Sequence, residues 1–173
     1  ETADTLAALR LAKKRGVKII GIVNAVGSSI ARESDVCLYT WGGPEIAVAS
    51  TKAYSVQVAM MYLVAFKLAL LNGSIDETRC KELIATLSDI PDRIGEMLND
   101  QEIYQSTANQ LINATSIFYI GRGLDYALSM EGSLKLKEIS YIHSESYAAG
   151  ELKHGTISLI EEDIPVIAVA TQS

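Results

Sequence analysis

The chain has 173 residues, of which 49% are hydrophobic, so it is long and apolar enough to bury a core. Its 21 acidic and 15 basic residues give a net charge of -6, which argues against nonspecific binding to nucleic acid. The most apolar run, residues 53–66, is bounded by Lys52 and Lys67. It is shorter than the roughly 20 residues that a membrane span requires, so we expect no membrane-spanning segment.

Two cysteines, Cys37 and Cys80, share no metal-ligand spacing, and we expect two free thiols in a reducing compartment. The His, Asp and Glu residues form no cluster with metal-ligand spacing, so we expect no metal site. The opening residues lack the pattern of a secretory signal peptide. A cytoplasmic protein is the expectation.

In chain order, residues 1–15 predict a surface helix that ends at Gly16, because apolar residues recur at helical spacing before a basic last turn. Residues 17–24 and 36–40 predict short apolar strands, typical of a parallel sheet covered on both faces. After a loop, residues 45–71 predict one long buried helix. Helix and strand alternate as in a parallel α/β fold.

The second half of the chain repeats this alternation. Its predicted elements are a helix over 74–90, a helix over 92–113, a strand that runs into a glycine turn over 116–123, a helix over 124–142 and a strand over 164–173. Neither half supplies enough strands for a complete parallel sheet. We therefore expect two three-layer αβα units, both partly truncated, with a boundary between residues 1–90 and 91–173.

Charged residues recur on the helix predicted over 124–142. Residues three, four or seven positions apart share a helix face, so Glu131, Lys135 and Glu138 should form one stripe. A solvated ladder of ion pairs is one interpretation of this pattern, since such ladders are common on helix surfaces. A functional site is the other.

Two neighbouring features favour the functional interpretation. The helix follows "IGRG", a glycine turn of the kind found at the ligand edge of parallel sheets. Beyond the helix, Gly150 and Gly155 flank His154, which places an imidazole on a short constrained segment. We interpret His143 as structural. Arg122 of the glycine turn belongs either to a simple backbone turn or to an anion or interface contact.

The stretch "EGSLKLKEISYIHSESYAAGELKHG" closely resembles the isomerase half of the glucosamine-6-phosphate synthase family, which is built from two sugar isomerase (SIS) domains of flavodoxin-like αβα architecture. "ETADTL" resembles the end of that family's phosphate loop. "RESD" and "PEIAVASTKAY" extend the resemblance through the middle of the chain. The resemblance thus covers nearly all of the sequence.

The resemblance implies an enzyme that adds ammonia to fructose 6-phosphate and isomerises the product to glucosamine 6-phosphate, without metal or organic cofactor. It implies that Glu138 is the base that moves a proton between C1 and C2, and that Lys135 stabilises the enolate oxygen. It implies that His154 opens the sugar ring in the site of a neighbouring subunit. A homodimer with shared active sites is the implied assembly.

The resemblance also implies substrate contacts in the first half of the chain. Thr2 would bind the phosphate, and Val48 and Ser50 would touch the sugar. From the residues alone, Thr2 and Ser50 are equally helix-cap candidates.

In that family a glutaminase domain supplies the ammonia and a later lysine forms an imine with the sugar, and this chain matches neither part. We therefore expect no complete turnover by this chain alone. Two alternatives stay open: a stand-alone SIS isomerase or amino-sugar deglycase, and a non-catalytic sugar-phosphate sensor.

Overall fold

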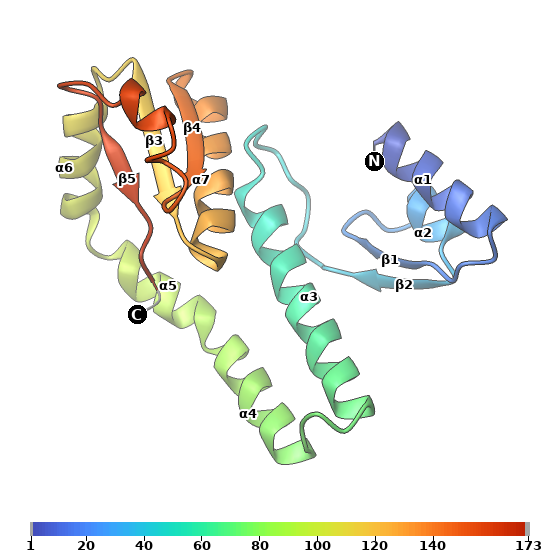
Figure 1. Ribbon diagram of the computed structural model, residues 1–173. Helices are drawn as coiled ribbons and strands as arrows, with labels where there is room; N and C mark the ends of the chain where they lie inside the picture. The colour runs from blue at the N-terminus through green and yellow to red at the C-terminus, as the bar shows by residue number, and fades with distance from the viewer. Residues whose placement is uncertain (1, 172–173) are drawn as a thin grey trace. The chain divides into compact units, whose positions relative to one another are not determined.

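The computed structural model describes residues 2–171 and divides the chain into two compact units, Glu1–Arg93 and Ile94–Ser173. Each unit contains a small parallel sheet (Figure 1). The first sheet has the strand order β1-β2 and the second has the order β4-β3-β5. The prediction of an α/β fold with parallel sheets is confirmed.

The first unit opens with α1 (Ala3–Lys14), β1 (Ile20–Val23), α2 (Ser29–Glu33) and β2 (Val36–Tyr39). Strands β1 and β2 run parallel, with Ile20 opposite Val36. Leu9 of α1 and Val23 of β1 are buried and belong to the small core of this unit. The predicted opening helix and both predicted strands are confirmed, with shorter strands.

Helix α2 was not predicted from the sequence. The Ser28 hydroxyl accepts a hydrogen bond from the Ala31 N–H at 3.2 Å, which caps the helix N-terminus. The Arg10 guanidinium of α1 donates to both carboxylate oxygens of Glu33, at 2.9 and 2.6 Å. A capped turn and a bidentate ion pair thus stabilise a helix of only 5 residues.

The long apolar helix differs from its prediction in two ways. Helix α3 (Thr51–Leu71) begins six residues later than the predicted 45–71, because the Glu45 carboxylate binds the N–H groups of Ile46 and Ala47 at 3.1 and 3.3 Å in a non-helical segment. Nor is it buried, since every residue of α3 is half-buried or exposed. The sheet of this unit has two strands and is too small to cover the helix.

By length and composition, α3 is also a candidate membrane-spanning helix, with 21 residues and a mean hydropathy of 1.6 over an 18-residue stretch. Core helices of soluble proteins meet the same criteria. The length and composition of α3 are therefore weak evidence for a membrane span.

The connecting helices are α4 (Glu77–Ser88), α5 (Ile90–Leu98) and α6 (Gln101–Leu111). Helix α4 confirms the predicted amphipathic helix and buries Cys80. The prediction of a single helix over 92–113 is wrong, because the helix is interrupted between α5 and α6. Asp100 has φ -93° and ψ 71°, which lies outside the helical region.

The second unit contains β3 (Ser116–Gly121), α7 (Leu124–Ser140), β4 (His143–Ala148), a 3₁₀ turn η1 (Thr156–Leu159) and β5 (Val166–Ala168). The central strand β3 pairs in parallel with both neighbours, placing Ser116 opposite His143 and Gly121 opposite Ala148. Ile117 and Phe118 of β3 are the core of this unit, at 0% and 3% exposure.

Helix α7 packs against β3 and β4. The approach is close at Gly132, where an added Cβ would lie 3.1 Å from the Tyr119 ring. Strand β4 was not predicted, and β5 is shorter than the predicted 164–173. Gln172 and Ser173 of that prediction lie outside the described residues.

Candidate active site

The predicted stripe forms on α7. The Lys135 ammonium lies 2.6 Å from a Glu138 carboxylate oxygen and 3.7 Å from a Glu131 carboxylate oxygen. The side chains of Glu131 and Lys135 are 22% and 18% exposed, and that of Glu138 is 31% exposed. A cation thus lies between two carboxylates on one half-buried face of the helix.

These contacts raise the pKa of Lys135, chiefly through its hydrogen bond to Glu138 and against the opposing effect of desolvation. The side chain therefore stays an ammonium at neutral pH. The Lys135 ammonium donates this hydrogen bond to one oxygen of the Glu138 carboxylate and so orients it. The arrangement can both accept a proton and stabilise a developing negative charge.

A hollow borders the last turn of α7, lined by Leu136 and Ser140 together with residues of α6. Glu138 is not among its lining residues. The carboxylate therefore lies on a partly open helix face and is not enclosed by this hollow.

Glu138 and His154 lie at opposite edges of the second sheet. Helix α7 starts at the carboxyl edge, directly after β3, and returns to the amino edge where β4 begins. Glu138 is in its last turn, about 20 Å along the axis from Leu124 at 1.5 Å per residue. His154 follows the end of β4 at the carboxyl edge. The two residues therefore lie at opposite edges of this sheet within a single chain.

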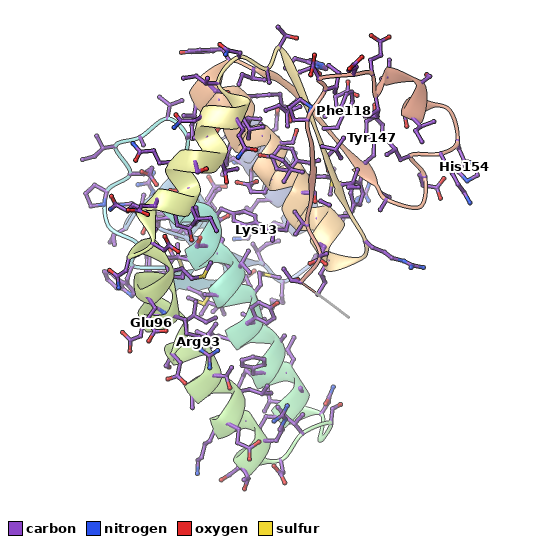
Figure 2. All side chains as sticks on the ribbon, turned by 90° about the vertical axis from the view of Figure 1, so that its left-hand side faces the viewer. Lys13, Arg93, Glu96, Phe118, Tyr147 and His154 are labelled. Atoms are coloured by element: carbon purple, nitrogen blue, oxygen red, sulfur yellow. The ribbon has the colours of Figure 1, made fainter. Side chains whose placement is uncertain are left out.

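The turn that carries His154 is anchored to the sheet. The Ala149 N–H donates to the Gly121 carbonyl at 2.8 Å, and the Glu151 N–H donates to the Ala148 carbonyl at 2.8 Å. The His154 N–H then donates to the Glu151 carbonyl at 3.0 Å. Figure 2 shows the imidazole on this turn, beyond Tyr147, where its side chain is exposed. The histidine is thus held on a constrained segment and presented outward.

The other histidine, His143, begins β4. Its Nδ1 lies 2.9 Å from the Ser116 hydroxyl on the paired strand, and its Nε2 lies 3.7 Å from a Glu145 carboxylate oxygen. Tyr147 donates to the other oxygen of Glu145, and this hydrogen bond raises the pKa of the Tyr147 phenol. His143 therefore contributes to a cross-strand polar contact, as the structural interpretation expects.

The predicted substrate contacts of the first unit lie at helix starts. Thr2 precedes α1, and its hydroxyl lies 2.5 Å from that of Thr5 and caps no backbone N–H. Ser50 precedes α3, and its hydroxyl caps no backbone N–H either. Val48 is 94% exposed. The alternative interpretation, in which the hydroxyls of Thr2 and Ser50 cap the helices that follow them, is therefore wrong.

The backbone conformation of the turn between β3 and α7 requires its two glycines. At Gly121 an added Cβ would lie 2.3 Å from the Asp125 carbonyl oxygen, and Gly123 adopts φ +58°. Arg122 is exposed, and its carbonyl accepts the Asp125 N–H at 3.1 Å. The backbone-turn interpretation accounts for the two glycines.

Two polar residues were missed by sequence reasoning. Asp125 is 5% exposed and accepts hydrogen bonds from the N–H and hydroxyl of Thr171, which fixes the chain after β5 to the start of α7. Asn24 follows β1 and binds the segment after β2. A polar residue directly after an apolar strand is the signal that identifies Asn24. No sequence signal marks Asp125, whose partner lies 46 residues away.

Within residues 2–171, no group of three or more His, Cys, Asp or Glu side chains could hold a metal ion. Cys37 and Cys80 are both free thiols, Cys80 buried and Cys37 half-buried.

Comparison with known proteins places these features in a family. The SIS domain matches residues 1–67 and 110–173. The chain is 57% identical over 172 residues to glutamine–fructose-6-phosphate aminotransferase [isomerizing] of Caldanaerobacter subterraneus subsp. tengcongensis, and the match covers 99% of this chain and 28% of that protein. The corresponding protein of Clostridium tetani is 56% identical with the same coverage.

A solved structure agrees with these sequence matches. The C-terminal domain of glucosamine-fructose-6-phosphate aminotransferase from Francisella tularensis matches with a TM-score of 0.93 and 39% identity, covering 100% of this chain and 49% of that one. The chain thus spans 28% of the length of the curated relatives named above. On the family match and the parallel α/β architecture together, the chain belongs to the SIS domain family.

Proposed function

We propose that this chain is part of a glutamine–fructose-6-phosphate aminotransferase of the isomerizing type. The observation that carries the proposal is 57% identity along 99% of the chain to a protein of that name. In the proposed reaction, ammonia condenses with the C2 carbonyl of fructose 6-phosphate and releases water. A proton then moves from C1 to C2 and the C1 hydroxyl proton passes to the nitrogen, which leaves an aldehyde at C1 and an amine at C2.

The proposed base for this proton transfer is Glu138. Its carboxylate is held by Lys135 at 2.6 Å, so one oxygen is oriented by the ammonium while the side chain stays 31% exposed to an incoming ligand. Lys135 keeps its charge at neutral pH and would stabilise the enolate oxygen at C1 that forms as the C1 hydroxyl loses its proton. The walls that would exclude water around Glu138 have to come from another part of the protein.

The proposed ring-opening residue is His154, acting in the site of a second subunit. The support is geometric: its turn lies at the carboxyl edge of the second sheet, whereas Glu138 lies near the amino edge. An exposed imidazole on an anchored turn is suited to reach a neighbouring chain. A homodimer whose active sites each need both chains follows from this assignment.

The proposed substrate contacts are Thr2 for the phosphate, and Val48 and Ser50 for the sugar. An anion is favoured at the start of α1 by the helix dipole and the N–H groups of its first turn. Val48 is exposed, and the Ser50 hydroxyl does not cap α3, so both side chains are available to a ligand. The chemistry requires neither a metal nor an organic cofactor.

We propose further that residues 1–90 and 91–173 belong to two SIS subdomains of a longer cytoplasmic protein, whose glutaminase domain supplies the ammonia. The coverage of 28% of the relatives supports a longer parent. In such a parent, α3 would be a core helix covered by other segments and not a membrane span. Residues 2–171 alone would not complete the reaction.

The test is an assay of the intact parent protein with fructose 6-phosphate and either glutamine or an ammonium salt. Glucosamine 6-phosphate from both nitrogen sources is the expected result. Isomerisation without nitrogen transfer, or release of ammonia from glucosamine 6-phosphate alone, would instead identify another SIS enzyme. Tight binding of the sugar phosphate with no product would identify a sensor.

A further inference from the structure

Asn24 lies directly after β1, at the carboxyl edge of the first sheet, and its side-chain amide binds the segment that follows β2. Its Oδ1 accepts hydrogen bonds from the Gly42 N–H at 2.8 Å and from the Thr40 hydroxyl at 3.2 Å. Its Nδ2 donates to the Gly43 carbonyl at 2.6 Å. Both ends of one amide therefore hold residues 40–43.

The turn held by Asn24 is tight. Trp41 and Gly43 adopt φ values of 53° and 69°, in the left-handed region that a tryptophan disfavours. At Gly42 an added Cβ would lie 3.3 Å from the Val56 side chain of α3 and 3.5 Å from the Asn24 Oδ1. A backbone in this conformation persists only when surrounding contacts hold it, and the Asn24 amide provides three of them.

The same segment leads to the proposed sugar contacts. The Lys52 ammonium donates to the Pro44 carbonyl at 2.6 Å, and the Ser50 N–H donates to the Val48 carbonyl at 3.0 Å. Ser50 directly precedes α3. The path from the sheet edge to Val48 and Ser50 is thus fixed at its start by Asn24 and in its middle by Lys52.

We infer that Asn24 is a positioning residue that sets the affinity for the sugar phosphate by fixing the segment that carries Val48 and Ser50. This inference rests on the proposed function of those two residues. Both polar atoms of the Asn24 amide bind residues 40–43, so the proposed role of Asn24 involves no contact with the reacting atoms. Its loss should therefore weaken binding and leave proton transfer at its normal rate.

The test uses the intact parent protein. Asn24→Ala removes all three hydrogen bonds and should raise KM for fructose 6-phosphate about tenfold, with kcat changed less than about twofold. Thr40→Val removes one of the three bonds at nearly constant shape and should raise KM about twofold to threefold. The matched control is Asn72→Ala, since the Asn72 side chain also binds a backbone N–H, that of Ser74, at 3.0 Å at the other end of α3. It should leave KM unchanged.

Two further measurements separate positioning from general stability. Calorimetric binding of fructose 6-phosphate should weaken in Asn24→Ala by the same factor as KM, and amide exchange should accelerate at Gly42 while that of β1 stays slow. A folded Asn24→Ala protein with unchanged KM and binding would overturn the inference. If that variant does not fold, unchanged binding by Thr40→Val would overturn it instead.

The same experiment distinguishes this inference from the proposed function. A wild-type parent that binds no hexose 6-phosphate would contradict both. A wild-type parent that binds and turns over the sugar, with an affinity that neither Asn24→Ala nor Thr40→Val changes, would contradict only the positioning role.

Discussion

The Lys135 ammonium donates to the Glu138 carboxylate across 2.6 Å, three residues along one face of α7. Glu131 lies 3.7 Å from the same ammonium on the other side. This order places the base of the proposed reaction beside the cation that would stabilise the negative charge of the enolate intermediate. Ion pairs of this spacing on a helix surface add little stability, so the effect of removing the cation should appear in catalysis.

Lys135→Met keeps the length of the side chain and removes its charge. In the intact parent it should lower kcat by about 100-fold or more, because a developing enolate oxygen loses its cationic neighbour. The matched control is Lys137→Met, two residues along the same helix at an exposed position. Steady-state kinetics on both variants give the result, and equal kcat values would remove Lys135 from the mechanism.

The placement of Glu138 and His154 at opposite edges of one sheet predicts complementation between chains. Parent proteins carrying His154→Ala or Glu138→Gln should each be inactive alone. Mixed dimers contain one site with both groups intact, so they should regain up to about half of wild-type activity per such dimer. Activity is measured after subunit exchange, with mixed dimers verified by mass. Verified mixed dimers without activity would show that each site uses the histidine of its own chain.

How far the sequence predicts the structure depends on the element. The stripe on α7 was predictable because helical spacing alone brings Glu131, Lys135 and Glu138 together. Strand β4 was missed because its sequence "HSESYA" lacks apolar alternation. The buried Ser144 hydroxyl of this strand donates to Ser133 of α7 at 2.9 Å, so polar pairing replaces apolar packing. That pairing cannot be inferred from spacing.

The first unit shows the same limit. The late start of α3 depends on the Glu45 carboxylate binding local N–H groups, which competes with helix formation. The exposure of α3 depends on how many strands surround it, which its own apolar composition does not specify. The sequence resemblance proposed Glu138 and His154 as site residues, while their placement at opposite edges of the sheet required the topology.

The glycine turn between β3 and α7 predicts a large effect of a small substitution. Gly121→Ala would place a Cβ 2.3 Å from the Asp125 carbonyl oxygen, a backbone atom that cannot move away freely. We expect a loss of about 3 kcal/mol or more in the free energy of unfolding. Gly95→Ala is the matched control, because its Cβ would meet nothing within 4 Å in helix α5 and should be neutral or stabilising. Chemical denaturation of both variants gives the comparison, and equal stabilities would contradict the close approach.

The ion pair between α1 and α2 predicts the response of the first unit to acid. The Arg10 guanidinium holds the pKa of Glu33 below its ordinary value of 4.5, mainly through their hydrogen bond. A lowered folded-state pKa stabilises the fold above the ordinary value, and this stabilisation is lost as pH falls through the folded-state pKa. Glu33→Gln should therefore lower the free energy of unfolding at neutral pH. Below about pH 4.5 the free energy of unfolding of this variant should fall less steeply than that of the wild type.

Denaturation midpoints measured between neutral and acidic pH test this response. Glu96→Gln, at an exposed position of α5, serves as the control and should follow the wild-type profile. A Glu33→Gln profile parallel to wild type throughout would show that the ion pair makes no net contribution.

The most direct measurement is deuterium uptake from solvent into the sugar carbons, followed by NMR during incubation of the intact parent with fructose 6-phosphate and an ammonium salt. The wild-type protein should exchange the transferred proton, and Glu138→Gln should slow this exchange by about 100-fold or more while still binding the sugar phosphate. The control Glu82→Gln, which breaks a comparable pair with Arg79 at 2.9 Å on α4, should exchange normally. Exchange at the wild-type rate in Glu138→Gln would show that another group moves the proton.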